Sequence, residues 1–165
     1  MIHQINQLKG PGPATSPRAI FLMGGPASGK STFRQREYPT LRAIDSDEIK
    51  QRHPDYDQKT PSALHQWSAA EAAREVFAAL GTGESLVYDG TGTSVEKYIQ
   101  FIRAAHAAGY ITELVYVACD VMTALARNAA RARSVPDAML REKHAAVATA
   151  FEVLSRYVDT VRVVS

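Results

Sequence analysis

The chain has 165 residues, of which 45% are hydrophobic, and its formal net charge is +2. This size and apolar content suit one globular domain with a core large enough to fold unaided. The charge is too small to make duplex nucleic acid or an anionic membrane an obligatory partner, and no apolar run approaches the length of a membrane span. With one cysteine, Cys119, and no apolar signal core, the chain is expected to be cytoplasmic, without an internal disulfide or a cysteine-based zinc site.

The N-terminal stretch, residues 1–18, contains Gly-Pro-Gly-Pro and a later Ser-Pro. Because Gly and Pro interrupt helical and strand periodicity, we expect a flexible arm here and a single domain over residues 19–165. The domain begins with the apolar run 19–23, which has the length of a buried strand.

Residues 24–32, Gly-Gly-Pro-Ala-Ser-Gly-Lys-Ser-Thr, match GxxxxGK followed by Ser or Thr, the phosphate-binding P-loop. Its glycines let successive backbone N–H groups form a nest, and the following helix adds the positive end of its dipole. Lys30 would reach the β- and γ-phosphates, and the Ser31 hydroxyl would bind Mg²⁺, so ATP and Mg²⁺ are the expected cofactors. The residues expected around the phosphates are Gly25, Pro26, Ala27, Ser28, Gly29, Lys30, Ser31 and Thr32.

A second, shorter strand is expected over 41–44, and acidic residues follow it directly. In open α/β sheets the ligand crevice lies beyond the carboxyl ends of the strands, so Asp45 or Asp47 could face the phosphate bound by the first loop. The alternative is that Ser46 or Asp47 only caps the helix expected over 48–52.

A long alanine-rich helix is expected over 60–80, with Thr60 as its N-cap. Trp67 falls at helical spacing with other apolar residues, which favours core packing over a role as a stacking platform. The next strand is expected over 85–88, and it ends in Asp89, a further strand-end acid in a glycine-rich turn.

The rest of the chain continues the alternation of helices and strands. A capping-box spacing starts a helix at Thr93, and His144, on the last helix, is assigned no role. The remaining elements are helix 93–108, strand 111–119, helices 122–132 and 137–157, and strand 160–164. Five strands alternating with helices indicate an α/β fold in which a parallel sheet is covered on both faces.

Four arginines lie within one short stretch around Pro136: Arg127, Arg131, Arg133 and Arg141. Phosphoryl transfer spreads negative charge over the equatorial oxygens, and guanidinium groups on a mobile segment could stabilise that charge and exclude water. We interpret the stretch as a kinase lid; the alternative is a solvated pair of basic helices.

The segment 43–56 contains an Asp-x-Asp, a Lys three residues on, and a His-Pro followed shortly by an aromatic residue. In this it closely resembles the zeta toxin family. Residues 88–92, Tyr-Asp-Gly-Thr-Gly, look like the family's strand-end turn, and 132–136, Ala-Arg-Ser-Val-Pro, look like its lid arginine shortly before a proline. With the P-loop, the resemblance extends from residue 19 to the lid.

In the zeta toxin family the fold is that of a P-loop kinase, and characterised members phosphorylate the 3′-hydroxyl of the sugar in UDP-N-acetylglucosamine with ATP and Mg²⁺. The resemblance therefore implies a three-layer P-loop kinase fold, with a five-stranded parallel sheet flanked by helices and an arginine-rich lid. It also implies a sugar-nucleotide substrate and an antitoxin protein as a candidate partner.

The family's functional positions can be matched to residues of this chain. Lys30 matches the phosphate-binding lysine, Asp47 the proposed catalytic base and Arg133 a lid arginine. Asp89 and Thr91 match substrate-side positions, and Asp89 joins Ser31 as a candidate Mg²⁺ ligand.

Other matches are looser. Glu71 corresponds to a helix carboxylate that contacts the sugar nucleotide, and either Arg127 or Arg131 could supply the second lid arginine. Lys50 is a candidate for orienting an anionic substrate, although a surface charge is the simpler interpretation.

Two departures leave the acceptor open. The strand-end acid is Asp89 where the family often has Glu, and Thr93 stands where a basic residue can occur. Moreover, Arg-Asn at 127–128 followed by Val-Pro at 135–136 resembles kinases that phosphorylate the 5′-hydroxyl of polynucleotides, so nucleic acid is the acceptor under that alternative. A small-molecule kinase is another alternative, and a nucleotide-binding module that acts through a protein partner is the alternative from a different class.

Overall fold

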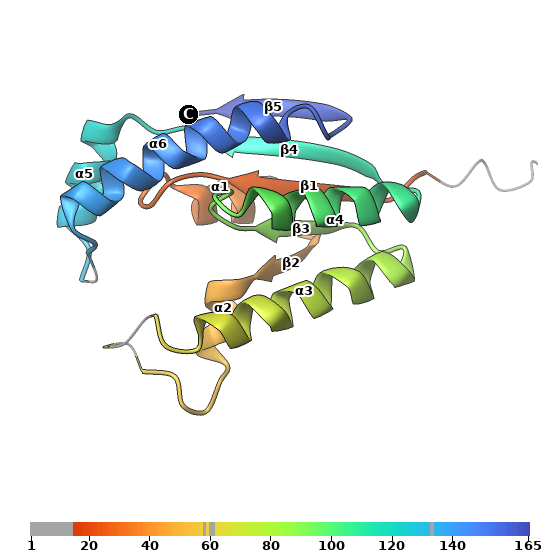
Figure 1. Ribbon diagram of the computed structural model, residues 1–165, viewed down its shortest axis with the longest axis horizontal. Coiled ribbons are helices and arrows are strands. Elements are labelled where there is room, and N and C mark those ends of the chain that lie inside the picture. Colours follow the sequence, from red (N-terminus) through yellow and green to blue (C-terminus); the bar gives the residue numbers. More distant parts are fainter. Residues whose placement is uncertain (1–14, 58, 60–61, 133) are drawn as a thin grey trace, which may run out of the picture.

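In the computed structural model, which describes residues 15–57, 59, 62–132 and 134–165, five strands form one sheet in the order β2-β3-β1-β4-β5 (Figure 1). Every pair of neighbouring strands is parallel, which confirms the sheet predicted from the alternation of elements. The strands are β1 (Arg18–Met23), β2 (Arg42–Asp45), β3 (Leu86–Asp89), β4 (Ile111–Val117) and β5 (Thr160–Val164).

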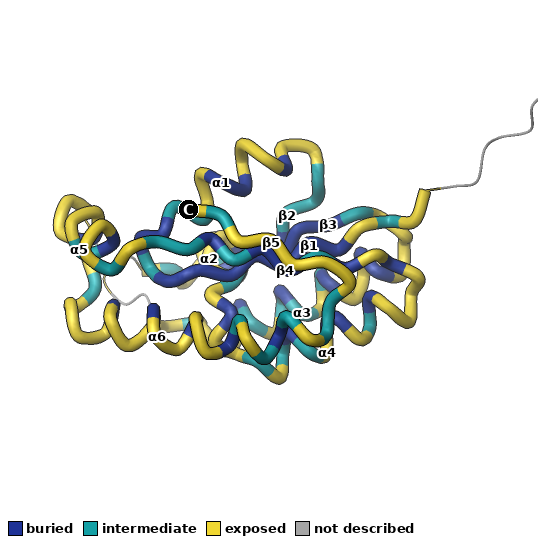
Figure 2. Tube along the Cα trace, turned by 90° about the horizontal axis from the view of Figure 1, so that it is seen from above, coloured by how far each residue is buried: buried dark blue, intermediate teal, exposed yellow. Residues whose placement is uncertain are grey.

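Helices cover both faces of the sheet, with α1 on one face and α3, α4 and α6 on the other (Figure 2). Successive side chains of β1 point to opposite faces, so Phe21 and Met23 pack with the three long helices while Ile20 and Leu22 pack with α1. The helices are α1 (Lys30–Glu37), α2 (Ser46–Gln51), α3 (His65–Thr82), α4 (Val95–Ala107), α5 (Val121–Ala129) and α6 (Asp137–Leu154).

The helix starts are where the structure departs most from the sequence-based prediction. The helix expected from Thr60 begins at His65, because residues 62–64 form a turn and Leu64 has a left-handed backbone with φ 65°. Thr60 itself lies outside the described residues. The capping box predicted at Thr93 is also wrong, since Ser94 is the N-cap of α4 and no side chain caps this helix.

The ends of the chain add two observations. Most of the arm predicted over 1–18 lies outside the described residues, and Arg18 is already the first residue of β1. Within the ranges given above, no helix combines the length and apolar content that a membrane crossing requires.

A buried tyrosine hydroxyl links α4 to the end of β1, just before the P-loop. The hydroxyl of Tyr98 donates a 2.7 Å hydrogen bond to the carbonyl oxygen of Leu22, and the residue is 2% exposed. A Cβ on Gly90 would come within 2.4 Å of this hydroxyl, so the turn after β3 can pass here only as glycine. The hydroxyl therefore connects α4 to the end of β1, and the turn after β3 packs close beside it.

We expect Tyr98→Phe to lower the free energy of unfolding by about 1–2 kcal/mol, because a buried carbonyl loses its donor while the ring stays in place. Urea unfolding measures this, and the m-value should not change. Tyr116→Phe is the matched control, since the Tyr116 ring is half-buried against Phe151; its cost should stay within about 0.5 kcal/mol. Equal costs for the two variants would contradict the role assigned to the Tyr98 hydrogen bond.

Candidate active site

The loop between β1 and α1 has the backbone of an anion nest. Ala27 and Gly29 both have left-handed backbones, with φ 60° and 89°, and Ser28 N–H donates to the Gly25 carbonyl at 3.2 Å. Gly29 is the N-cap of α1, which has no side-chain cap and no acidic residue in its first turn. The N–H groups of this turn are thus left for an anionic ligand, as the P-loop motif predicts.

Lys30, at the start of α1, lies beside the acid at the end of β3. Its Nζ is 2.8 Å from Asp89 Oδ1, and the Asp89 side chain is 1% exposed. Parallel register places Asp89 next to Asp45 at the end of β2, so two carboxylates meet at the same edge of the sheet. The sequence predicted both acids at this edge, and the register brings them together.

Arg34 binds these carboxylates, and its role was missed by the sequence analysis. Its Nη1 lies 2.9 Å from Asp89 Oδ2 and 3.2 Å from Asp45 Oδ2, while Nη2 pairs with Glu48. Burial lowers the pKa of Arg34, but the contacts with Glu48, Asp89 and Asp45 outweigh it and the pKa stays above its ordinary value. One signal was available: Arg34 is four residues after Lys30 and therefore shares its helix face.

Asp45 is a buried acid and also the cap of α2. Its Oδ1 accepts a 2.8 Å hydrogen bond from the Asp47 N–H, so the cap expected at Ser46 or Asp47 is in fact Asp45. Burial, followed by the charge of Asp89, raises the pKa of Asp45 to about 6, and the hydrogen bond from Asp47 opposes this rise.

Asp47 stands outside the buried network. Its side chain is 83% exposed on the first turn of α2, and Lys50 Nζ lies 4.0 Å from its Oδ1. The Lys50 side chain is only 7% exposed, so the interpretation of Lys50 as a surface charge is wrong. Because the Asp47 carboxylate is exposed, it can accept a proton from an incoming hydroxyl without first breaking a buried contact.

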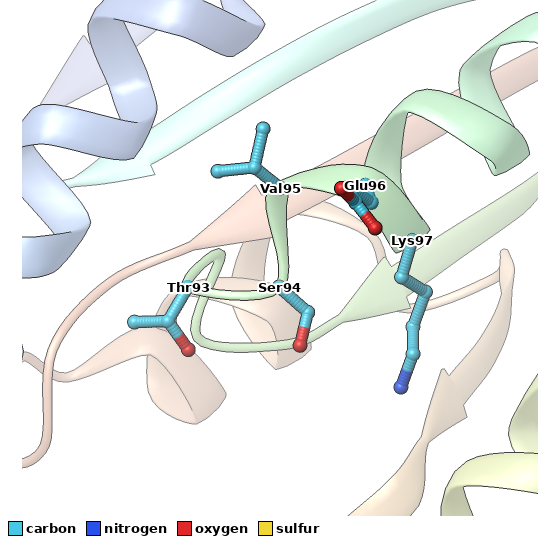
Figure 3. A pocket seen from close by; sticks show the side chains of 5 residues that line it. All are labelled: Thr93, Ser94, Val95, Glu96 and Lys97. Atoms are coloured by element: carbon cyan, nitrogen blue, oxygen red, sulfur yellow. The ribbon is translucent and has the colours of Figure 1, made fainter.

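The turn after β3 is joined to the P-loop. The N–H of Gly24 donates to the Thr91 carbonyl at 3.1 Å, and the Thr91 hydroxyl lies 3.0 Å from that of Thr93. Beyond this turn, a cavity of about 480 Å³ is lined by residues 93–97. Figure 3 shows the side chains of Thr93, Ser94 and Lys97 pointing to the same side of the chain, while Val95 points the opposite way. Three polar side chains therefore face the same side at the start of α4.

Two residues of α3 have different surroundings from those predicted. Glu71 Oε1 lies 3.0 Å from Arg74 Nη1, so this candidate substrate ligand is paired within its own helix. Trp67 is 36% exposed and meets the ring of His53 edge-on at 4.6 Å, so the core position predicted for it is wrong. The Trp67 and His53 rings lie on the side of the site that α2 and α3 form.

The arginine segment lies on the other side of the P-loop. Arg127 of α5 and Arg131, just after it, line a cavity of about 760 Å³ together with Ala27, Ser28, Gly29 and Thr32. Arg127 Nη1 is 3.4 Å from the Ala27 carbonyl oxygen. Arg133 lies outside the described residues, so both Arg127 and Arg131 remain candidates for a lid arginine.

The oxygen donors near Lys30 fit the chemistry of Mg²⁺. Ser31 offers a hydroxyl, and Asp89 Oδ1 faces Lys30 in an ion pair whose angles are not those of a hydrogen bond, which leaves lone-pair capacity on this oxygen. Within the described part of the chain, no three His, Cys, Asp or Glu side chains are grouped to hold a metal. A magnesium ion here would thus need phosphate and water oxygens as further ligands.

Comparison with known proteins gives consistent likenesses. A family model described as Zeta toxin matches residues 4–165. Toxin zeta of Enterococcus hirae is 29% identical over an alignment of 114 residues that covers 62% of this chain and 40% of that protein. The chain thus spans about two fifths of the length of the curated relatives it matches.

Two solved structures share the fold. One, of the PezAT chromosomal toxin-antitoxin system of Streptococcus pneumoniae, is 17% identical, covers 91% of this chain and 67% of its own, and has a TM-score of 0.68. The other, AvrRxo1-ORF1:-ORF2 with ATP, is 17% identical, covers 86% of this chain and 50% of its own, and has a TM-score of 0.68.

We expect Arg34→Met to lower the free energy of unfolding by about 3–5 kcal/mol, because it leaves the buried carboxylates of Asp45 and Asp89 without their shared cation. Urea unfolding at pH 7 measures this. Arg36→Met is the matched control on the same helix, where the side chain is 70% exposed and pairs only loosely with Glu37; its cost should be within about 1 kcal/mol. A cost for Arg34→Met no larger than that of the control would contradict the network.

Asp45 should make the protein less stable as the pH rises from about 4 to 7. Its pKa is raised from 3.8 to about 6, so the folded state binds this proton more tightly than the unfolded chain does, and the free energy of unfolding falls through that window. Two pKa units correspond to about 3 kcal/mol.

Asp45→Asn keeps an acceptor for the Asp47 N–H but does not titrate. The variant should therefore lack the part of the pH dependence of the free energy of unfolding that comes from Asp45. Urea unfolding of both proteins at several pH values gives the difference curve. Parallel curves for the wild type and Asp45→Asn would show that Asp45 does not titrate in this range.

Proposed function

Because this chain belongs to the zeta toxin family, we propose that it is an ATP-dependent phosphotransferase that transfers the γ-phosphoryl group to a sugar hydroxyl of UDP-N-acetylglucosamine. The observation that carries the proposal is the contrast between the strand-end acids. Asp45 and Asp89 are buried and bound to Arg34, whereas Asp47 is exposed beside Lys50. A general base has to reach the substrate, and Asp47 is the acid of this group that can.

On the donor side, the N–H groups of residues 25–32 and the Lys30 ammonium would hold the phosphates. Lys30 would then exchange part of its contact with Asp89 for a phosphate oxygen. Bound Mg²⁺ would neutralise phosphate charge, with Ser31 and Asp89 as its protein ligands. A cytoplasmic location, where ATP is available, accompanies this proposal. One structural neighbour was solved with ATP, which supports the choice of donor.

On the acceptor side, the sugar hydroxyl attacks the γ-phosphorus, and its proton passes to the Asp47 carboxylate. The bond between the γ-phosphorus and the bridging oxygen breaks, and ADP leaves with that oxygen. Thr91 and Lys50 are the residues that would orient the acceptor near Asp47, and Glu71 of α3 is a further candidate. Arg127, Arg131 and Arg133 are the candidates for stabilising the charge of the transferring group.

Part of the pattern shared with polynucleotide kinases has a structural role in this chain. Asn128 accepts a 3.0 Å hydrogen bond from the Val135 N–H and donates a 2.7 Å bond to the Val135 carbonyl. The Asn and Val-Pro pattern shared with polynucleotide kinases therefore has a structural explanation, which is to close the turn between α5 and α6. The pattern therefore does not by itself decide between a nucleic acid and a sugar nucleotide as the acceptor.

A protein inhibitor is the proposed partner. The PezAT structure is described as a toxin-antitoxin system, and the printed name of the curated relative is Toxin zeta. An antitoxin that covered Asp47 or the P-loop would block the reaction, because both are required together. A nucleotide-binding module without catalytic activity is the alternative that the next experiment tests.

We expect Asp47→Asn to lower the rate of phosphotransfer about 10²- to 10⁴-fold, because the amide cannot accept the hydroxyl proton. ATP binding should change little, since Asp47 is not part of the phosphate nest. Mass spectrometry of products after incubation with Mg²⁺, ATP and UDP-N-acetylglucosamine measures the rate, and calorimetry measures ATP binding. Glu152→Gln, the same chemical change at an exposed position of α6, is the control and should keep wild-type turnover.

A 5′-hydroxyl oligonucleotide is incubated in parallel. Product on the oligonucleotide alone would overturn the sugar-nucleotide acceptor but keep the phosphotransferase. Tight ATP binding with product on neither acceptor would favour the binding module. Wild-type turnover by Asp47→Asn would remove Asp47 as the base.

A further inference from the structure

Helices α5 and α6 carry the arginines around Pro136, and a side chain from each helix donates a hydrogen bond to a carbonyl of the P-loop. His144 of α6 lies with its Nε2 2.9 Å from the Pro26 carbonyl oxygen, and Arg127 of α5 lies 3.4 Å from that of Ala27. A carbonyl oxygen only accepts, so Nε2 of His144 carries the proton. His144, to which the sequence assigned no role, is 7% exposed and contacts the P-loop.

The His144 ring packs directly on the P-loop backbone. A Cβ added to Gly25 would lie 2.6–2.7 Å from three atoms of the imidazole ring. Real Cβ contacts are not that short, so the loop and the ring can meet only because residue 25 is glycine. Gly25, which stands at a variable position of the motif, thus has a packing reason to be glycine.

The hydrogen bond from His144 sets the direction of one peptide group. No peptide bond between described residues is cis, and in a trans peptide the carbonyl and the following N–H point in opposite directions. Turning the Pro26 carbonyl towards α6 therefore turns the Ala27 N–H away from α6. A P-loop binds phosphate through N–H groups that face the ligand, which requires the carbonyls to face outwards.

Ala27 has a backbone conformation that needs external support. Its φ of 60° is one that residues with a Cβ rarely adopt. The carbonyl before it is bound by His144 and its own carbonyl by Arg127. Ala27 is 5% exposed and packs in a cluster with Ala124 of α5 and Leu140 of α6. The same two helices thus hold the Pro26–Ala27 segment by two hydrogen bonds and by the apolar cluster around Ala27.

We propose that His144 is a positioning residue that holds the P-loop in its phosphate-binding conformation and so couples the α5–α6 segment to nucleotide binding. The inference deepens the proposed function, since it rests on a polyphosphate being the ligand of the loop. It does not depend on which hydroxyl is the acceptor. A movement of the α5–α6 segment would then alter phosphate binding through Pro26 and Ala27 as well as through the arginines.

The test compares His144→Phe, which keeps a ring beside Gly25 but cannot donate, with His144→Gln, whose amide can donate. Calorimetry measures the dissociation constants of ATP and of inorganic tripolyphosphate, which lacks the base and ribose. We expect His144→Phe to weaken both about tenfold, and His144→Gln to stay within about threefold of the wild type. Lys143→Ala, at the exposed neighbouring position, should leave both constants unchanged.

Steady-state kinetics adds a readout that a general loss of stability would not move. In His144→Phe the KM for ATP should rise about tenfold while kcat stays within about threefold, because the variant changes binding of the donor and leaves Asp47 untouched. Wild-type dissociation constants for both ligands in His144→Phe would overturn the inference. So would equal weakening in His144→Phe and His144→Gln, since that would point to ring packing and not to the hydrogen bond.

A measurement on the wild type covers the case in which His144→Phe does not fold. The imidazole NMR signals of His144 should shift on saturation with tripolyphosphate, while those of exposed His65 should not. An unmoved His144 signal would overturn the inference. A wild-type chain that binds tripolyphosphate with this dependence on His144, but transfers no phosphate from ATP, would refute the proposed function and leave the positioning role intact.

Discussion

The pairing of Arg34 with the strand-end carboxylates is the constraint around which the site is built. Parallel register sets Asp45 beside Asp89, and like charges so close are tolerated only with compensating cations. Arg34 from α1 supplies one and Lys30 supplies the other. Because both cations lie on the helix that follows the P-loop, the loop and the two acids cannot be positioned independently of each other.

This arrangement separates the acids by function. Buried carboxylates held by an arginine are poor proton acceptors for a substrate, since they are neither accessible nor without a partner. Asp47 lies two residues beyond Asp45, and the N–H of Asp47 is bound by the Asp45 carboxylate. The cap therefore fixes the start of α2 and leaves the Asp47 side chain in solvent. The buried acid positions the backbone, and the exposed acid is available for chemistry.

The order of elements, the parallel sheet and the P-loop could be predicted because each depends on a local pattern: apolar runs of strand length, glycines at fixed spacing, acids directly after strands. The partners of Arg34 and His144 could not be predicted, since they are up to 118 residues away and a helical pattern does not say which neighbour a face will meet. The burial of Lys50 was missed for the same reason. The cap of α2 was misplaced by one or two residues because three polar residues in a row can each cap a helix.

The contacts across the P-loop also indicate where acceptor specificity can reside. On one side, His144 and Arg127 bind α6 and α5 to the loop, and Asn128 binds Val135 in the connection between these helices. On the other side lie α2, α3 and the turn after β3, where polar groups at the start of α4 border an open cavity. A change of acceptor would then require changes on this second side alone. The P-loop, held from α5 and α6, could stay as it is while the acceptor side differs.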